Sequence, residues 1–160
     1  MENLTETTLH NNVAFIYEYT ESVLKDVNKS IDNTTTKLIA TIGFSGVLLR
    51  FAADLPDSKY SFSVKVGVCF LVTLAIGFCG TGLLPKTSGD IVKPEKLLEP
   101  EWYRASDELC KLYVLRQWQS AISQLDELLA LRTMCLNLAI GSLIIASFLF
   151  ALSIVLGAMK

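Results

Sequence analysis

The stretch that decides the fold of this chain is MCLNLAIGSLIIASFLFALSIVLGAM, residues Met134–Met159. No acidic, basic or histidine side chain interrupts it, and the nearest charges on either side are Arg132 and Lys160. The hydrocarbon core of a bilayer is about 30 Å thick, and a helix that rises about 1.5 Å per residue crosses it in about 20 residues. The stretch therefore predicts a transmembrane helix.

Two further apolar runs, Leu38–Leu55 and Val66–Leu84, have a similar character. The first contains Arg50 and Asp54, but an arginine near a helix end extends its charged head to the membrane surface at modest cost. Charged residues make up 19% of the chain, against about 25% in soluble domains. We therefore predict an all-α membrane protein with three transmembrane helices, a hairpin at 38–84 and a third helix at 134–160.

The distribution of lysine and arginine predicts the orientation. Three spans would place residues 1–37 and 85–133 on one side of the membrane, and that side is cytoplasmic when it holds most of the basic residues. It holds ten of the 14: Lys25, Lys29, Lys37, Lys86, Lys93, Lys96, Arg104, Lys111, Arg116 and Arg132. We therefore expect a cytoplasmic N-terminus. The acidic, polar start MENLTETT does not resemble a signal peptide, so we expect the first run to remain in the membrane.

The segments outside the runs predict two amphipathic helices. Apolar residues recur at three- and four-residue steps over 8–37, so a helix is expected there that runs on into the first span. Residues 85–100 contain three prolines and predict a linker. No helix breaker follows until Gly141, so one long helix is expected from about Pro100 to about Met159, with 101–133 in the cytoplasm. Its outer part carries an apolar stripe: Trp102, Ala105, Leu109, Leu112, Leu115, Trp118, Ile122, Leu125 and Leu129.

Two amphipathic helices that pack as a pair share a single contact surface. Each helix therefore leaves part of its apolar stripe uncovered. We therefore expect a homo-oligomer in which subunits bury the remainder. The alternative is a monomer whose amphipathic aromatic side chains lie at the level of the lipid headgroups.

Residues that carry chemistry are sparse. The chain has one histidine, His10, and four cysteines without a C-x-x-C pair, so we predict no metal site and no cofactor. The acidic pairs Asp107–Glu108 and Asp126–Glu127 are adjacent on helices and point apart, so we predict no catalytic residue and no enzyme activity. A net charge of −2 offers no electrostatic reason to bind nucleic acid.

Small and polar residues within the runs are candidates for helix contacts. Gly43 and Gly46 in the first run, with Ala40, and Gly77 and Gly80 in the second, with Gly82, permit close helix approach. This packing lies either within one subunit or between subunits. Asn137 and Ser142 in the third run would either bond across helices or line a pore.

The layout also resembles a known family. The residues that carry the resemblance are Asp32–Lys37 before the first run, Pro85 and Pro94 in the linker, and a helix with Leu109, Tyr113, Gln119, Ile122, Leu125, Leu128, Leu129 and Arg132 that leads into Met134–Met159. Over roughly residues 12–158, the chain is similar to the Pycsar-type transmembrane effectors and the related SLATT-like families of bacterial antiphage defence. It departs from their pattern at Leu38, where alanine is expected.

The resemblance implies a two-part abortive-infection system in the bacterial inner membrane. A partner cyclase would make a cyclic nucleotide, or a partner regulatory protein would act directly, and this effector would then disrupt the lipid bilayer through an oligomeric pore. The implied phosphate contacts are Lys86, Lys93, Lys96, Arg104, Lys111 and Arg116, with Trp102 and Tyr103 stacking on the base. Alternatively, these side chains form a solvated face that anchors at the membrane. The competing functions are a non-toxic structural or regulatory subunit that docks a partner, and a small constitutive channel.

Overall fold

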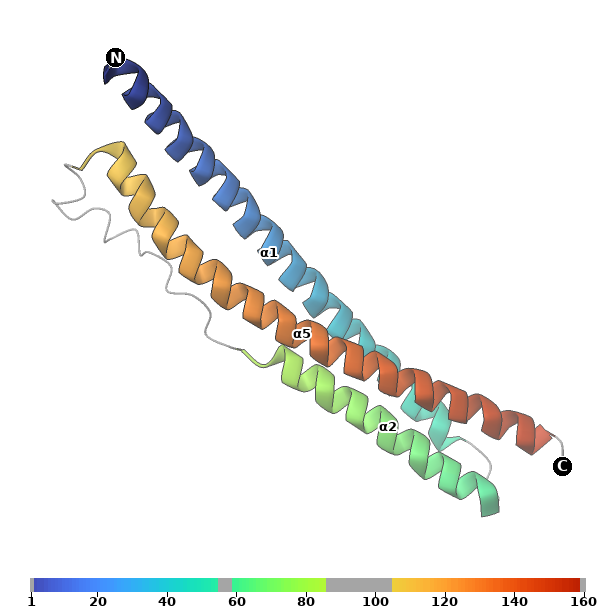
Figure 1. Ribbon diagram of the computed structural model, residues 1–160. Coiled ribbons are helices and arrows are strands. Elements are labelled where there is room, and N and C mark those ends of the chain that lie inside the picture. The colour runs from blue at the N-terminus through green and yellow to red at the C-terminus, as the bar shows by residue number, and fades with distance from the viewer. Residues whose placement is uncertain (1, 55–58, 86–104, 159–160) are drawn as a thin grey trace. The chain divides into compact units, whose positions relative to one another are not determined.

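The computed structural model describes residues 2–54, 59–85 and 105–158, which contain three α-helices (Figure 1). They are α1 (Glu2–Ala53), α2 (Lys59–Leu83) and α5 (Asp107–Ala158), and the described residues include no strand. All three helices are long and apolar enough to cross a membrane. This confirms the predicted helical class and the prediction of three candidate spans.

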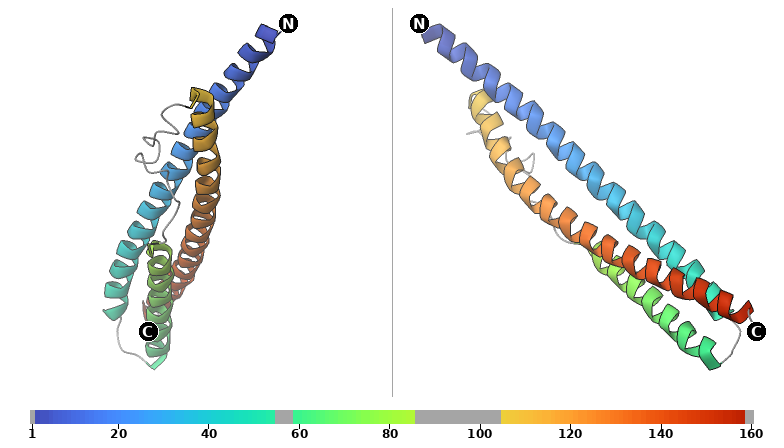
Figure 2. Two further views of the ribbon diagram at one scale, coloured as in Figure 1. Left: turned by 90° about the vertical axis from the view of Figure 1, so that its left-hand side faces the viewer. Right: turned by 45° about the vertical axis from the view of Figure 1, so that its right-hand side comes forward.

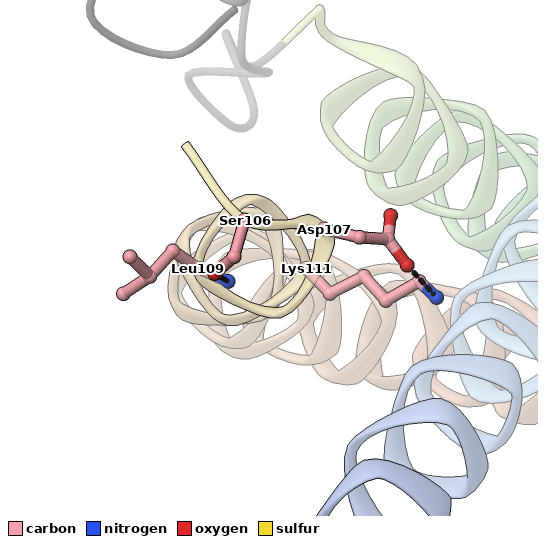
Figure 3. A network of polar contacts seen from close by, with 4 residues as sticks. All are labelled: Ser106, Asp107, Leu109 and Lys111. Carbon is pink, nitrogen blue, oxygen red and sulfur yellow. Dashed lines mark hydrogen bonds and ion pairs between the residues drawn. The ribbon is translucent and has the colours of Figure 1, made fainter. Parts of the chain in front are cut away.

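The helix ends differ from the predicted ones. The helix predicted from residue 8 begins at Glu2, and the helix predicted from Pro100 begins at Asp107, with Ala105 and Ser106 outside it. Ser106 accounts for the later start of α5, because its Oγ accepts a hydrogen bond from the backbone N–H of Leu109 at 3.4 Å (Figure 3). Such a side-chain acceptor satisfies a backbone donor that has no partner in the first helical turn. The predicted linker at 85–100 lies outside the described residues, apart from Pro85.

The chain divides into two compact units. The first unit comprises residues 1–31 and 86–129, and its described part is the N-terminal segment of α1 with the N-terminal segment of α5. Its buried apolar residues are Val13 and Ile31 on α1 and Ala121 and Leu128 on α5. The rings of Tyr17 and Trp118 join the two helices, with centroids 4.9 Å apart.

Members of the apolar stripe predicted for residues 101–133 differ in exposure, and Trp118 of the stripe contacts Tyr17 of α1. Leu109 and Leu112 are exposed, whereas Ala121, which the stripe omitted, is buried. On α1, Ile16 is 49% exposed. The contact surface favours a small residue because it lets the helix backbones approach closely.

The second unit comprises residues 32–85 and 130–160, and it contains the hydrophobic core. In it, α2 lies alongside the C-terminal half of α5 (Figure 2). The core brings together all three helices: Leu38, Leu48 and Ala52 of α1, Val68, Val72, Ala75 and Cys79 of α2, and Leu136, Ala139, Leu143 and Ala146 of α5. Many large apolar side chains outside this core are exposed, among them Phe44, Phe70 and Phe148. This is the distribution expected of helices that face lipid.

Several hydroxyl groups in the second unit form hydrogen bonds within their own helices. Ser45 is fully buried and donates to the carbonyl of Thr41 at 2.7 Å, and Thr41 donates to the carbonyl of Lys37 at 2.7 Å. Thr73 donates in the same way to Cys69 at 2.8 Å. These bonds let polar residues remain in an apolar environment at low cost.

Candidate functional site

A groove in the first unit is the best candidate for a ligand site. It has a volume of about 370 Å³ and lies between α1 and α5. Its lining residues are Ile16, Tyr19, Thr20 and Val23 of α1, and Leu112, Leu115, Arg116, Gln119 and Ile122 of α5. A mostly apolar hollow of this size with a few polar groups is typical of small-molecule sites.

The polar groups of the groove limit what it can bind. Among the described residues that line it, Arg116 supplies the one positive charge, and Tyr19 and Gln119 supply neutral polar groups. The Thr20 hydroxyl proton is not available to a ligand, because the hydroxyl donates it to the carbonyl of Ile16 at 2.7 Å. The groove therefore suits a small molecule with an apolar body and one anionic group, which a guanidinium can bind through paired N–H donors.

Lys111 was predicted to contact phosphate together with Arg116, but it does not line the groove. Its Nζ donates to Asp107 Oδ2 at 2.6 Å, one turn away on α5 (Figure 3). This hydrogen bond is the main reason that the pKa of Lys111 is raised above its ordinary value of 10.5. Lys111 is therefore charged near neutral pH, and its ammonium group forms an ion pair with Asp107.

The other predicted ligand residues lie outside the described part of the chain. They are Lys86, Lys93, Lys96, Trp102, Tyr103 and Arg104. Of the two predicted contacts that the structure describes, Arg116 lines the groove and Lys111 does not.

The second unit has a larger groove of about 580 Å³ between α1 and α5. Its lining is apolar apart from the hydroxyls of Thr41 and Ser147, and it includes the exposed rings of Phe44 and Phe148. The predicted pore residues do not line this groove. Asn137 is exposed on α5, and Ser142 donates to the carbonyl of Leu138 in its own helix at 2.8 Å.

Among the glycines predicted to permit close helix approach, Gly43, Gly46, Gly77 and Gly80 make no such contact with the residues that the structure describes. A Cβ atom added at Gly43, Gly46, Gly77 or Gly80 would have no heavy atom within 4 Å, so contact between subunits remains the open alternative. Gly82, which belongs to the same predicted set, does make a close contact. A Cβ there would lie 3.1 Å from Cys135 Cβ and 3.2 Å from Leu38 Cδ1. Three helices therefore meet at Gly82.

A polar contact that we did not predict lies near this meeting point. Arg132 Nη1 donates to Thr35 Oγ1 at 2.6 Å, which joins α5 to α1 within the second unit. One signal in the sequence pointed to this level of the helices, because Arg132 is the last charge before the apolar run of α5. The partner on α1 could not be identified without the helix register.

No grouping typical of a metal site occurs among residues that the structure describes, where no three His, Cys, Asp or Glu side chains come together. Comparisons of the chain with protein-family models, curated proteins and solved structures give no match.

Proposed function

We propose that this protein is a membrane effector of a bacterial antiphage system that disrupts inner-membrane integrity in response to a signal. The observation that carries the proposal is the division into two units, each with its own groove, to which both α1 and α5 contribute. A ligand changes a conformational equilibrium when it binds one state better than the other. A helix shared between units is a direct physical route by which that change would reach the membrane.

In this proposal, the second unit spans the inner membrane and the first unit lies in the cytoplasm. The long helices α1 and α5 continue from the cytoplasm into the bilayer, and the N-terminus is cytoplasmic. The excess of lysine and arginine outside the apolar runs supports this orientation.

The groove at Arg116 is the proposed site of the signal. Its positive charge and apolar walls suit an anionic amphipathic molecule such as a cyclic nucleotide from a partner cyclase. A partner regulatory protein that occupies the same groove is the alternative signal. We propose no catalytic role for any residue.

Oligomerisation is proposed because the first unit leaves apolar surface uncovered. Phe15 is 69% exposed, Tyr19 is 64% exposed and Leu109 is 57% exposed, and all three lie outside the apolar runs. Lipid tails would not reach this surface, so a second subunit is the proposed cover. The spans contain no charged residue near their midpoints, which favours a poorly selective opening over a charged filter.

The same exposed apolar surface favours one competing function, a non-toxic subunit that docks a helix of a partner protein. The two functions differ in their effect on cells. An effector depolarises the inner membrane when its signal is present, whereas a docking subunit does not.

The test is the inner-membrane potential of cells that express the protein, measured with a voltage-sensitive dye. Leu125→Pro should abolish depolarisation, because proline in a helix interior costs about 3 kcal/mol or more and would interrupt α5 shortly before the segment that belongs to the second unit. Leu125→Ala is the matched control, since alanine preserves the helix. Both variants must be present in the membrane fraction at the wild-type level.

Depolarisation that requires a second gene or an added nucleotide would support the effector. Depolarisation in the absence of any trigger would indicate a constitutive channel. An unchanged potential under every condition would leave the docking subunit as the better account.

A further inference from the structure

Arg132 is a partly buried guanidinium with a neutral partner. Its Nη1 donates to Thr35 Oγ1 at 2.6 Å, while its Nε is shielded from solvent and has no hydrogen-bond partner in the structure. Within the described ranges, no carboxylate lies at ion-pair distance from Arg132. A partly buried cation without an anion is costly, and an anion that binds there would offset the cost.

The contacts around Gly82 indicate where Arg132 lies relative to the bilayer. Gly82 near the end of α2 meets Leu38 at the start of the first apolar run and Cys135 at the start of the third. The polar ends of the three apolar segments therefore lie at one level. Arg132 is less than one helical turn before Cys135, so a bilayer around the second unit places its guanidinium near the headgroups.

We propose that Arg132, oriented by Thr35, binds a phosphate group at the surface of the membrane. A guanidinium has five N–H donors in a fixed planar arrangement, and the contact with Thr35 uses one of them. The other N–H groups of Nη1 and Nη2 match the geometry of phosphate oxygens. Lipid headgroups supply phosphate at this level, and soluble phosphate has the same chemistry. The proposal requires that the second unit spans a bilayer, but it does not require effector function.

The test is lipid retention on the purified full-length protein, counted by native mass spectrometry after release from nanodiscs. The nanodiscs contain phosphatidylglycerol and diacylglycerol with identical acyl chains, so the two lipids differ in the phosphoglycerol headgroup. Wild-type protein should retain phosphatidylglycerol in preference to diacylglycerol by roughly tenfold, which is the effect of one charge-assisted hydrogen-bonded contact.

Three variants assign that preference to the site. Arg132→Gln should reduce it to less than about twofold, and Arg132→Lys should give an intermediate value because it keeps the charge but loses the planar donors. Lys37→Gln is the matched control, because Lys37 is an exposed cation at the same level of α1 and should change the preference by less than about twofold.

The proposal fails if wild-type protein shows no preference, a result that does not depend on whether any variant folds. It also fails if Arg132→Gln and Lys37→Gln reduce retention equally, since that would indicate only general attraction to a charged surface. Inorganic phosphate added at millimolar concentration identifies the source. Displacement of the lipid means that the site accepts free phosphate, and retention means that it selects the lipid.

Discussion

Arg132 on α5 and Thr35 on α1 are 97 residues apart in sequence, yet Nη1 of the arginine donates to Oγ1 of the threonine at 2.6 Å. Leu38, one helical turn after Thr35, is fully buried and contacts Gly82. The polar contact therefore lies beside the hydrophobic core of the second unit and fixes the register of α1 against α5 there.

Removing the acceptor should weaken this register. Thr35→Val keeps the shape of the side chain but leaves the Arg132 guanidinium without its partner, so we expect the free energy of unfolding to fall by about 1 kcal/mol. Thr35→Ser keeps the hydroxyl and is the control. Thermal unfolding of the purified protein, followed by circular dichroism, measures the difference. Equal midpoints for the valine and serine variants would show that the hydrogen bond contributes nothing.

Gly82 should tolerate a side chain worse than Gly77. Gly82→Ala places a methyl group 3.1 Å from Cys135 Cβ, which cannot retreat without moving the backbone of α5. Overpacking of this kind costs about 1–3 kcal/mol. Gly77→Ala meets no heavy atom within 4 Å and should be neutral or stabilise the helix by up to about 1 kcal/mol. Unfolding midpoints of the two variants measure the contrast, and a reversed order would contradict the packing at Gly82.

The ring contact between Tyr17 and Trp118 should couple the two helices of the first unit. A double-mutant cycle of Tyr17→Leu and Trp118→Leu should give a coupling free energy of about 1 kcal/mol, since the ring centroids are 4.9 Å apart. Hydrogen exchange of backbone amides in α1 reports the opening free energy of this unit. Strictly additive effects would mean that the rings do not interact in solution.

Arg116 and Lys111 should differ in their effect on the proposed signal. Arg116→Gln removes the positive charge of the groove, so the nucleotide concentration for half-maximal depolarisation should rise roughly tenfold. Lys111→Gln should leave that concentration nearly unchanged, because Asp107 occupies the ammonium group. Equal shifts for the two variants would indicate a diffuse electrostatic effect rather than binding in the groove.

The exposed rings of Phe15 and Tyr19 should support self-association. Their centroids are 6.5 Å apart in a stacked arrangement, and replacing both by serine should weaken the association constant by at least roughly tenfold through lost apolar burial. Asn28→Ser, at another exposed position of α1, is the control. Mass photometry in detergent gives the distribution of oligomers. An unchanged distribution in the double variant would exclude this surface as the subunit contact.

Several features of the candidate site could not be predicted from the sequence. The basic residues outside the runs suggested a broad phosphate surface, but only the packing of α1 against α5 separates Arg116, which lines a groove, from Lys111, which pairs with Asp107. Which glycine of α2 makes a close contact likewise depends on which face of α2 meets Cys135, and Gly82 lies on that face.

The sequence by itself determined that this protein consists of apolar helices of membrane-spanning length, because helix rise and bilayer thickness convert the length of an apolar run directly into a span. Tertiary structure alone decided which faces of those helices form the core and which side chains meet. In a helix such as α5 beyond Arg132, nearly every face is apolar, so hydrophobic periodicity does not distinguish a core-facing residue such as Leu143 from an exposed one such as Phe148. Rotation and register between helices resolve that ambiguity, and the contact of Arg132 with Thr35 depends on them.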